Sequence, residues 1–260
     1  MLKLEITDKH YIVEETDDYA VVCKPHKMHC APLSKKDGTS LLEWYGNENP
    51  LIYNISGRGR GEGGLMHRLD YETEGLILFA KNQKAFDHFQ CQQENGEFIK
   101  SYDALSIKTE NLSPGYPPND KISYSLKQFI IESGFRPFGP GRKAVRPALE
   151  ISGKKTDIAT DRNYYYQTDV CSVKKLWYND TDIFAIRVKI KKGFRHQIRC
   201  HLAWVGYPII NDALYGPEND FGENKFLALR SYEISFADIP GKRKLYRIMP
   251  FELEIKDKQG

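Results

Sequence analysis

Short apolar segments separated by turn-forming residues constrain the fold of this chain most strongly. The segment 11–24 predicts a β-hairpin around the acidic turn Asp17-Asp18, and the segment 76–80 predicts a buried strand. The segment 182–190 alternates apolar and polar residues, as a half-buried strand does. Further strands are predicted over 98–107, 227–236 and 245–255. Many short strands joined by tight connections predict an α+β fold with a mixed, largely antiparallel sheet.

Three helices are expected among these strands. One begins after Thr39 or Ser40, and a second begins after Asn82, because these residue types cap helix N-termini. A third amphipathic helix is predicted over 195–205, with Arg195 and Arg199 along one stripe of its surface.

Residues 111–167 contain six prolines and several glycines, which interrupt any long periodicity. They predict a loop-rich insertion with short elements inside one catalytic domain that covers residues 1–260. The glycine-rich segment 57–64 predicts a flexible loop. We expect no S4-type RNA-binding module before the hairpin.

Positive charge is concentrated locally, although the net charge of the chain is only +3. One basic group contains Lys189, Lys191, Lys192, Arg195 and Arg199, and another contains Arg136, Arg142, Lys143 and Arg146. Such groups can bind phosphates, although solvated strand ends and loops are the more common explanation of such a run taken alone.

The five cysteines are scattered and include no C-x-x-C pair, which favours reduced thiols over disulfides or a zinc site. The first residues lack the apolar run of a signal peptide, and no stretch has the length of a membrane span. We therefore expect a cytoplasmic protein without membrane association.

Two stretches carry residue types suited to chemistry. The first runs from His67 to Leu76 and places Asp70 in a tight loop, next to Arg68 and directly before an apolar strand. An aspartate in such a loop is most often only a turn former. The second stretch runs over 193–216 and places Arg199 on the inner side of the third helix. A buried arginine needs a carboxylate partner, and Asp70 is the candidate.

Together these stretches closely resemble the RluA family of pseudouridine synthases. The first resembles the family pattern H-R-L-D-x-x-T-S-G-L around its catalytic aspartate, and the second resembles the family's H-Q-I-R-x-H-L helix and the turn after it. Weaker agreements lie at 20–24, 100–105 and 227–230. The resemblance implies the pseudouridine synthase fold with a central catalytic cleft, and the isomerisation of uridine to pseudouridine in ribosomal or transfer RNA.

The resemblance also implies roles for individual residues. Asp70 would attack the sugar or the uracil ring, Arg199 would pair with it and lower its pKa, and Tyr102 would stack on the target base. Arg68 would help to fill the space that the flipped uridine leaves.

The remaining assignments concern RNA binding and cofactors. Four basic residues would contact phosphates. They are Lys191, Lys192, Arg195 and His196. The reaction would need no cofactor and no metal, and we expect a monomer. Glu74 departs from the family serine and would add negative charge near the phosphates, and Asn211 departs from a usual glycine.

Other interpretations fit the sequence less well. The G-x-G-x-x-G match at 59–64 neither follows a clear strand nor opens a helix, as a dinucleotide site requires. His196, Cys200 and His201 lack the further ligands that zinc needs, so satisfied polar contacts are expected there. A non-catalytic RNA-binding relative is the main alternative function, and a carboxylate-dependent nucleotide hydrolase is the second.

Overall fold

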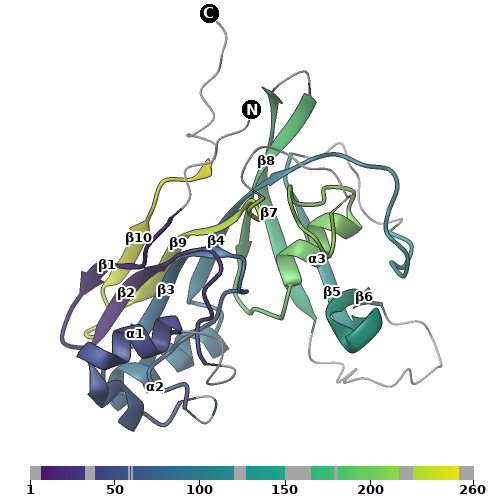
Figure 1. Cartoon of the computed structure of the whole chain (residues 1–260). Helices are drawn as coiled ribbons and strands as arrows, with labels where there is room; N and C mark the ends of the chain where they lie inside the picture. The colour runs from purple at the N-terminus through teal and green to yellow at the C-terminus, as the bar shows by residue number, and fades with distance from the viewer. Residues whose placement is uncertain are drawn as a thin grey trace, which may run out of the picture. The chain divides into compact units, whose positions relative to one another are not determined.

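The computed structural model describes residues 7–32, 39–57, 59, 61–119, 127–149, 165–178, 181–216 and 225–251. Within these ranges the chain forms three α-helices, two short 3₁₀ helices and ten strands (Figure 1). All the strand pairs named below are antiparallel except β3–β9, so the predicted α+β class with a mixed, largely antiparallel sheet is confirmed.

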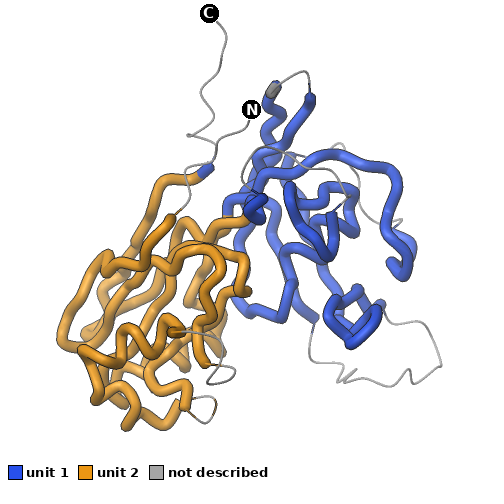
Figure 2. Tube along the Cα trace, viewed as in Figure 1, with its two compact units in different colours: residues 1–4, 103–228, 251–260 blue, residues 5–102, 229–250 orange. Residues whose placement is uncertain are grey.

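The chain divides into two compact units, which Figure 2 distinguishes by colour. Unit 1 comprises residues 1–4, 103–228 and 251–260, and unit 2 comprises residues 5–102 and 229–250. The strand β4 (Ile99–Ser106) begins in unit 2 and ends in unit 1. The expectation of one catalytic domain stays a prediction.

Unit 2 is built on five strands in the order β1-β2-β3-β9, with β10 paired to β9. They are β1 (Tyr11–Glu15), β2 (Tyr19–Lys24), β3 (Glu74–Ala80), β9 (Leu229–Ala237) and β10 (Arg243–Arg247). The predicted hairpin is confirmed, because β1 and β2 pair antiparallel. β2 and β3 are buried along their whole length, which explains their nearly continuous apolar sequences.

Two helices complete unit 2, and both begin at the predicted caps. Ser40 and Glu43 form a capping box at the start of α1 (Leu41–Glu48), which the 3₁₀ helix η1 (Pro50–Asn54) follows. The Asn82 side chain accepts a hydrogen bond from Ala85 at the start of α2 (Gln83–Glu94). Ring contacts hold α2 on the sheet, where Phe89 meets Tyr19 and Phe236 edge-on.

Unit 1 contains four strands in the order β8-β7-β5-β6, and the helix α3. The strands are β5 (Phe129–Phe138), β6 (Ala144–Ala148), β7 (Tyr166–Tyr178) and β8 (Thr181–Ile190). The helix is α3 (Gln197–Trp204), and the 3₁₀ helix η2 (Pro140–Arg142) lies between β5 and β6. The predicted strand over 182–190 is confirmed. The predicted insertion over 111–167 therefore includes the ten-residue strand β5, and its residues 120–126 and 150–164 lie outside the described ranges.

The third helix differs from the sequence prediction in two respects. It begins at Gln197 rather than Arg195, because His196 adopts a left-handed backbone conformation with φ of 57°. All eight of its residues are buried, including the polar Gln197, Arg199 and His201, so the helix has no solvent-exposed face and the polar surface that an amphipathic helix predicts is absent. Arg195 lies before the helix and shares no helical stripe with Arg199.

The end of the glycine-rich segment 57–64 is tightly packed, since an added Cβ at Gly64 would lie 1.9 Å from the carbonyl oxygen of Ala80, whereas one at Gly61 would meet no atom within 4 Å. Gly64 accepts a hydrogen bond from Ala80, and Leu65 bridges to Phe79, so the segment joins β3 at its end. The flexibility of the rest of this loop stays a prediction. Arg58 and Arg60 lie outside the described ranges, as does the part of the predicted strand 245–255 after residue 251.

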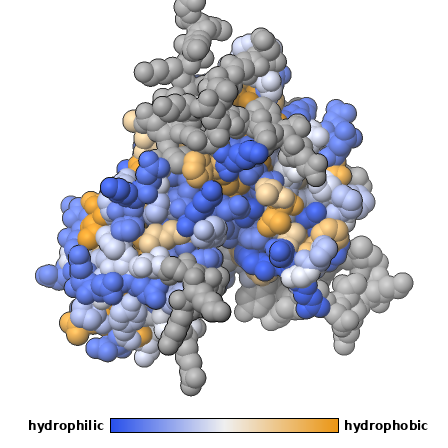
Figure 3. All heavy atoms as spheres, viewed as in Figure 1, coloured by the Kyte–Doolittle hydropathy of each residue, from blue (hydrophilic) through white to orange (hydrophobic). Residues whose placement is uncertain are grey.

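Hydrophilic residues predominate on the face drawn in Figure 3, where hydrophobic residues form scattered small groups. In the described part of the chain, no helix has both the length and the apolar character needed to cross a membrane.

Candidate active site

Asp70 lies in a tight turn of unit 2, directly before β3, as its sequence position predicts. Its backbone carbonyl accepts a hydrogen bond from the Thr73 amide (3.1 Å), and its side chain is partly exposed. Gly75 allows this turn to enter β3 beside β9: its φ is +117°, and an added Cβ would lie 2.2 Å from the Ser231 carbonyl oxygen. The backbone of Asp70 is therefore held in place, and its side chain has access to solvent.

The ammonium group of Lys24 lies beneath this turn and is fully buried. Its Nζ donates hydrogen bonds to the carbonyl oxygens of Pro25 (2.8 Å), Met28 (2.9 Å) and Tyr71 (3.3 Å). Each of the three N–H groups of the ammonium thus has a carbonyl oxygen as acceptor. Burial lowers the pKa of Lys24 to about 8, whereas the negative charge of Asp70 acts to raise it. Lys24 ties the segment after β2 to the residue next to Asp70.

The buried thiol of Cys30 holds the residue on the other side of Asp70. Its Sγ lies 3.1 Å from the Leu69 amide nitrogen and 3.2 Å from the Leu69 carbonyl oxygen. Burial raises the pKa of Cys30 to about 11, so the thiol stays protonated and can donate to that carbonyl. Both backbone neighbours of Asp70 are therefore fixed by buried side chains.

Tyr102 lies in unit 2, at the start of β4, and is almost fully buried. Burial and the negative charge of Asp70 raise the pKa of Tyr102 well above its usual range, while a hydrogen bond with the Ser231 side chain acts against this shift. The structure therefore brings Asp70 and Tyr102 close enough to interact electrostatically, and it keeps the phenol protonated at neutral pH.

Glu74 does not add charge to an RNA-facing surface, so that expectation was wrong. Its side chain is completely buried, and its Oε1 accepts a hydrogen bond from the Nε of Arg230 at 2.6 Å. Its Oε2 accepts a hydrogen bond from the Thr7 amide (2.8 Å) and lies 3.5 Å from Nε2 of His26. Arg230 therefore neutralises the carboxylate inside unit 2.

Arg68 points away from the buried part of unit 2. Its side chain is 62% exposed and forms an ion pair of 3.1 Å with Glu62. The side chain remains accessible to a ligand, since a solvent-exposed pair of this kind is weak.

Arg199 lies in unit 1, buried within α3. Its Nε and Nη2 each donate a hydrogen bond of 2.7 Å to the two carboxylate oxygens of Asp212. Oδ1 of Asp212 also accepts from the amides of Leu214 and Tyr215, which fixes the turn after α3. Arg199 has a carboxylate partner in its own unit, as burial requires, and its pairing with Asp70 stays a prediction.

The residues expected to bind phosphates lie before α3. Lys191, Lys192 and Arg195 are exposed, and His196 is half-buried. Nη2 of Arg195 donates to the Arg142 carbonyl oxygen (2.7 Å), and Nδ1 of His196 lies 3.0 Å from the Tyr215 hydroxyl.

Some members of the two basic groups named from the sequence do not lie on the surface. Arg199 and Arg146 are buried, which removes both from any phosphate-binding surface. Arg146 lies 4.3 Å from the ring centroids of both Tyr116 and Phe138, and its Nε donates to the Pro114 carbonyl oxygen. It is a packing residue of unit 1.

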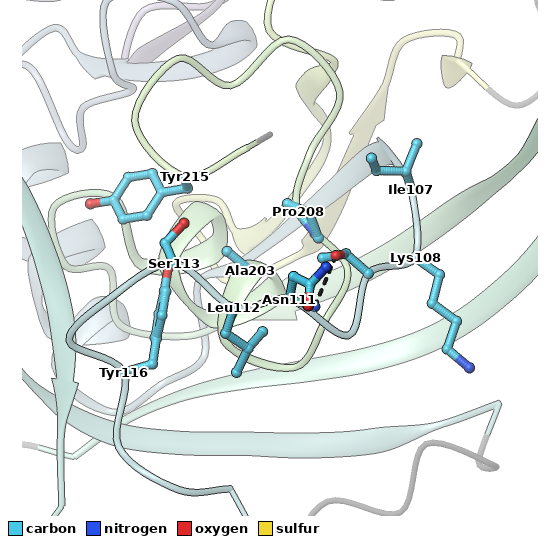
Figure 4. Close-up of a pocket in the computed structure, with 10 residues that line it drawn as sticks. Ile107, Lys108, Asn111, Leu112, Ser113, Tyr116, Ala203, Pro208 and Tyr215 are labelled. Carbon is cyan, nitrogen blue, oxygen red and sulfur yellow. Dashed lines mark hydrogen bonds between the residues drawn. The ribbon is translucent and has the colours of Figure 1, made fainter. Parts of the chain in front are cut away.

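A cavity of about 350 Å³ opens in unit 1 near these aromatic residues (Figure 4). Tyr116 and Tyr215 lie at one side of it and Lys108 at the other. Its remaining lining residues are Ile107, Thr109, Asn111, Leu112, Ser113, Ala203 and Pro208. None of the predicted site residues lines this cavity.

The described residues contain no group of three or more His, Cys, Asp and Glu side chains placed to hold a metal ion. His201 makes polar contacts instead, with Nδ1 at 2.8 Å from the Thr168 hydroxyl and Nε2 at 2.9 Å from the Ser133 hydroxyl. The expectation of satisfied polar contacts at His201 is confirmed.

Sequence reasoning missed three contributors to these arrangements. Lys24 donates to the carbonyl oxygen of Tyr71, which is far along the chain. Asp212 accepts a hydrogen bond from Arg199, and Ser231 hydrogen-bonds Tyr102. The lysine at the end of an apolar strand, immediately before a proline, was the one available signal.

The chain is similar to known proteins of one family. The family model of the RNA pseudouridylate synthases matches residues 18–204. An uncharacterized RNA pseudouridine synthase of Mycoplasma pneumoniae is 25% identical over 228 residues, which cover 86% of this chain and 61% of that protein. The ribosomal large subunit pseudouridine synthase D of Haemophilus ducreyi is 25% identical over 232 residues, which cover 85% and 58%.

The chain thus spans about three fifths of the length of these curated relatives. The solved structure of human RNA pseudouridylate synthase domain containing 1 has a TM-score of 0.66 at 16% identity, with 95% of this chain and 86% of that chain covered. At this identity the structural likeness shows a shared fold. Since the family model matches well over half of the sequence, the chain belongs to the RNA pseudouridylate synthase family.

Proposed function

We propose that this chain isomerises uridine to pseudouridine in RNA, with Asp70 as the catalytic carboxylate. The observation that carries the proposal is the placement of Asp70: a partly exposed carboxylate, anchored through both backbone neighbours by Lys24 and Cys30, within electrostatic reach of Tyr102. A turn-forming aspartate needs no such support. A carboxylate that acts as a nucleophile or a general base on an extruded uracil ring does need a fixed position.

The proposed reaction conserves every atom. The bond between the uracil nitrogen and the ribose carbon breaks, the base turns, and a bond from a ring carbon to the same ribose carbon forms. That ring carbon loses a proton, and the released nitrogen gains one, so neither a redox step nor a co-reactant is needed. Asp70 attacks either the sugar or the ring, and the bond that it forms breaks again before the product leaves, which restores the carboxylate. Tyr102 supports the base and its proton transfer.

The other site residues take the roles expected of them in this proposal. Arg199 pairs with Asp70 in addition to Asp212 and favours the ionised carboxylate. Arg68 helps to fill the space left by the uridine, whose unstacking costs a few kcal/mol. Lys191, Lys192, Arg195 and His196 contact RNA phosphates.

We further propose that the substrate is ribosomal or transfer RNA and that the protein acts as a monomer in the cytoplasm, without a cofactor. The name of the Haemophilus ducreyi relative supports a ribosomal substrate.

The test begins with a map of pseudouridines across total RNA from cells with and without this protein. An RNA that loses a pseudouridine then serves as substrate for the purified chain. We expect wild type and Asp87→Asn to convert it, because Asp87 is an exposed carboxylate on α2. Asp70→Asn should bind the RNA with unchanged affinity and convert none of it.

Two outcomes would contradict the proposal. Equal conversion by Asp70→Asn would remove the assigned chemistry. Tight RNA binding by the wild type without any conversion of a mapped site would favour the alternative of a non-catalytic RNA-binding relative.

A further inference from the structure

Three aromatic side chains form a stacked column in unit 1 that runs from the core to the surface. His201 is fully buried, Phe135 is 7% exposed and Phe194 is 36% exposed. The ring of Phe135 lies 4.8 Å from that of His201 and 4.8 Å from that of Phe194, with interplanar angles of 28° and 4°. The column therefore ends in a partly exposed ring that is parallel to the ring beneath it.

The column is held rigidly at both ends. The His201 ring is fixed by the hydroxyls of Thr168 and Ser133. The Phe194 amide donates to Oε1 of Gln197 (3.0 Å), and its carbonyl oxygen accepts from the Gln197 amide (3.1 Å). The Gln197 side chain is 2% exposed and donates in turn to Thr168 and to the Gln167 carbonyl oxygen. A surface ring with this support is preorganised for stacking, because binding orders little that is not already ordered.

The chain segments that carry Phe194 and Phe135 are basic, whereas the paired strands β5 and β7 also carry Glu132 and Asp169. No aspartate or glutamate occurs over residues 183–211, nor over residues 133–149. Lys191, Lys192 and Arg195 are exposed beside Phe194 in the chain. The hydrogen bond from Arg195 to the Arg142 carbonyl joins the second basic group to the first. A ligand suited to this surface carries both a flat ring and negative charge.

We propose that Phe194 is a stacking platform for an unpaired base of the RNA, with the phosphates of the same segment on Lys191, Lys192 and Arg195. This inference rests on the proposed function, because it takes RNA as the substrate. Tyr102 is assigned to the target uridine, so the base on Phe194 is another nucleotide of the same RNA. Unpaired nucleotides are the preferred class, since bases inside a duplex already stack on their neighbours.

The experiment uses two probes: a uridine-rich 12-nucleotide single-stranded RNA with one central 2-aminopurine, and the same strand in a duplex. We expect wild-type protein to quench the 2-aminopurine fluorescence of the single strand. Phe194→Leu keeps apolar volume against Phe135 but removes the ring. It should lower the affinity for the single strand roughly 5- to 100-fold and abolish the quenching. The affinity for the duplex should change less than about twofold, since the phosphate contacts remain.

Two further variants serve as controls. Phe194→Trp keeps a ring and should retain both affinity and quenching. Trp177→Ala removes a ring that is 60% exposed and lies opposite Asp182 in the sheet, and it should leave both unchanged. The slope of affinity against salt concentration should be the same for Phe194→Leu as for wild type, because no charge is lost.

The platform would be overturned by single-strand binding without quenching in the wild type. Wild-type affinity of Phe194→Leu for the single strand, or an equal loss for single strand and duplex, would overturn it as well. Uridine conversion is measured in parallel with the same preparations. Stacking without conversion would contradict the isomerase proposal alone, whereas conversion without stacking would contradict the platform alone.

Discussion

At the scale of single residues, the position of Asp70 is set by hydrogen bonds to the residues on either side of it more than by hydrogen bonds of its own backbone. Leu69 is held by the thiol of Cys30, and Tyr71 accepts a hydrogen bond from Lys24. Both supporting side chains are buried, so neither can be replaced by water when it is removed. Substitutions beneath the turn should therefore affect both stability and turnover.

Lys24→Met is the direct test of this support. It removes one donor from each of three carbonyl oxygens, of which that of Tyr71 still accepts from the Met28 amide. We expect a loss of about 1–3 kcal/mol in the free energy of unfolding together with reduced turnover. Lys81→Met is the matched control, because Lys81 forms a partly exposed ion pair of 3.0 Å with Glu15. That variant should lose about 1 kcal/mol or less. Denaturant unfolding and single-turnover rates measure both effects, and equal behaviour of the two variants would refute the special role of Lys24.

His201 gives a prediction about pH. Burial lowers the pKa of His201 to about 3, whereas an unfolded histidine titrates near 6.5. Between these values the unfolded state binds the proton and the folded state does not, so stability falls as the pH decreases from about 6.5 toward 3. The contribution of this residue approaches about 1.4 kcal/mol per pH unit in that window. His201→Gln should show a flatter dependence between pH 4 and 6.5 in urea titrations, and an unchanged slope would contradict the assignment.

At the scale of elements, the turn before β3 requires glycine at position 75. Gly75→Ala would place a methyl group 2.2 Å from the Ser231 carbonyl oxygen, at a φ that side chains rarely adopt. We expect a loss of about 3 kcal/mol or more and a matching loss of turnover. Gly134→Ala in β5 is the control, since its Cβ would lie 3.4 Å from the Ala148 carbonyl oxygen and should cost less than about 1 kcal/mol. Thermal unfolding of the two variants decides between these expectations.

The elements that the sequence predicts well are those specified by adjacent residues. Ser40 and Asn82 cap their helices, and the hairpin from Tyr11 to Lys24 forms around its acidic turn. The departure of Asn211 from glycine also has a local reason, because its φ is 60° and asparagine tolerates that conformation. Local steric and capping preferences were sufficient for these predictions.

Long-range partners were beyond prediction. Glu74 and Arg230 are 156 residues apart, and nothing near either residue in the chain indicates their pairing. The left-handed conformation of His196 shortened α3, and burial on all sides left this helix without a solvent-exposed polar face. Of the candidate site, the family resemblance named Asp70, Tyr102 and Arg199, whereas no pattern in the sequence indicated the Asp212 partner of Arg199.

At the scale of the whole molecule, positive charge is distributed unevenly along the chain. Residues 103–228 contain 19 lysines and arginines against 14 aspartates and glutamates, although the net charge of the full chain is only +3. An RNA-binding surface built on unit 1 would therefore work through a local field that the net charge conceals.

The salt dependence of RNA binding tests this distribution. Lys191→Gln combined with Lys192→Gln should weaken binding to all RNAs alike and reduce the slope of log affinity against log salt by about 1.4 for single strands. Lys84→Gln removes an exposed lysine from α2 in unit 2 and should leave the slope unchanged. Filter binding from 50 to 300 mM salt supplies the slopes, and equal slopes for all three proteins would exclude Lys191 and Lys192 from the interface.

The buried pair of Glu74 and Arg230 has an evolutionary consequence. Loss of either partner alone would leave an unpaired charge inside the protein, at a cost of about 3–5 kcal/mol, which is a large fraction of the roughly 5–15 kcal/mol by which a domain is stable. Because a serine cannot neutralise a guanidinium, homologues that combine the family serine at position 74 with an arginine at position 230 should carry another carboxylate beside that arginine.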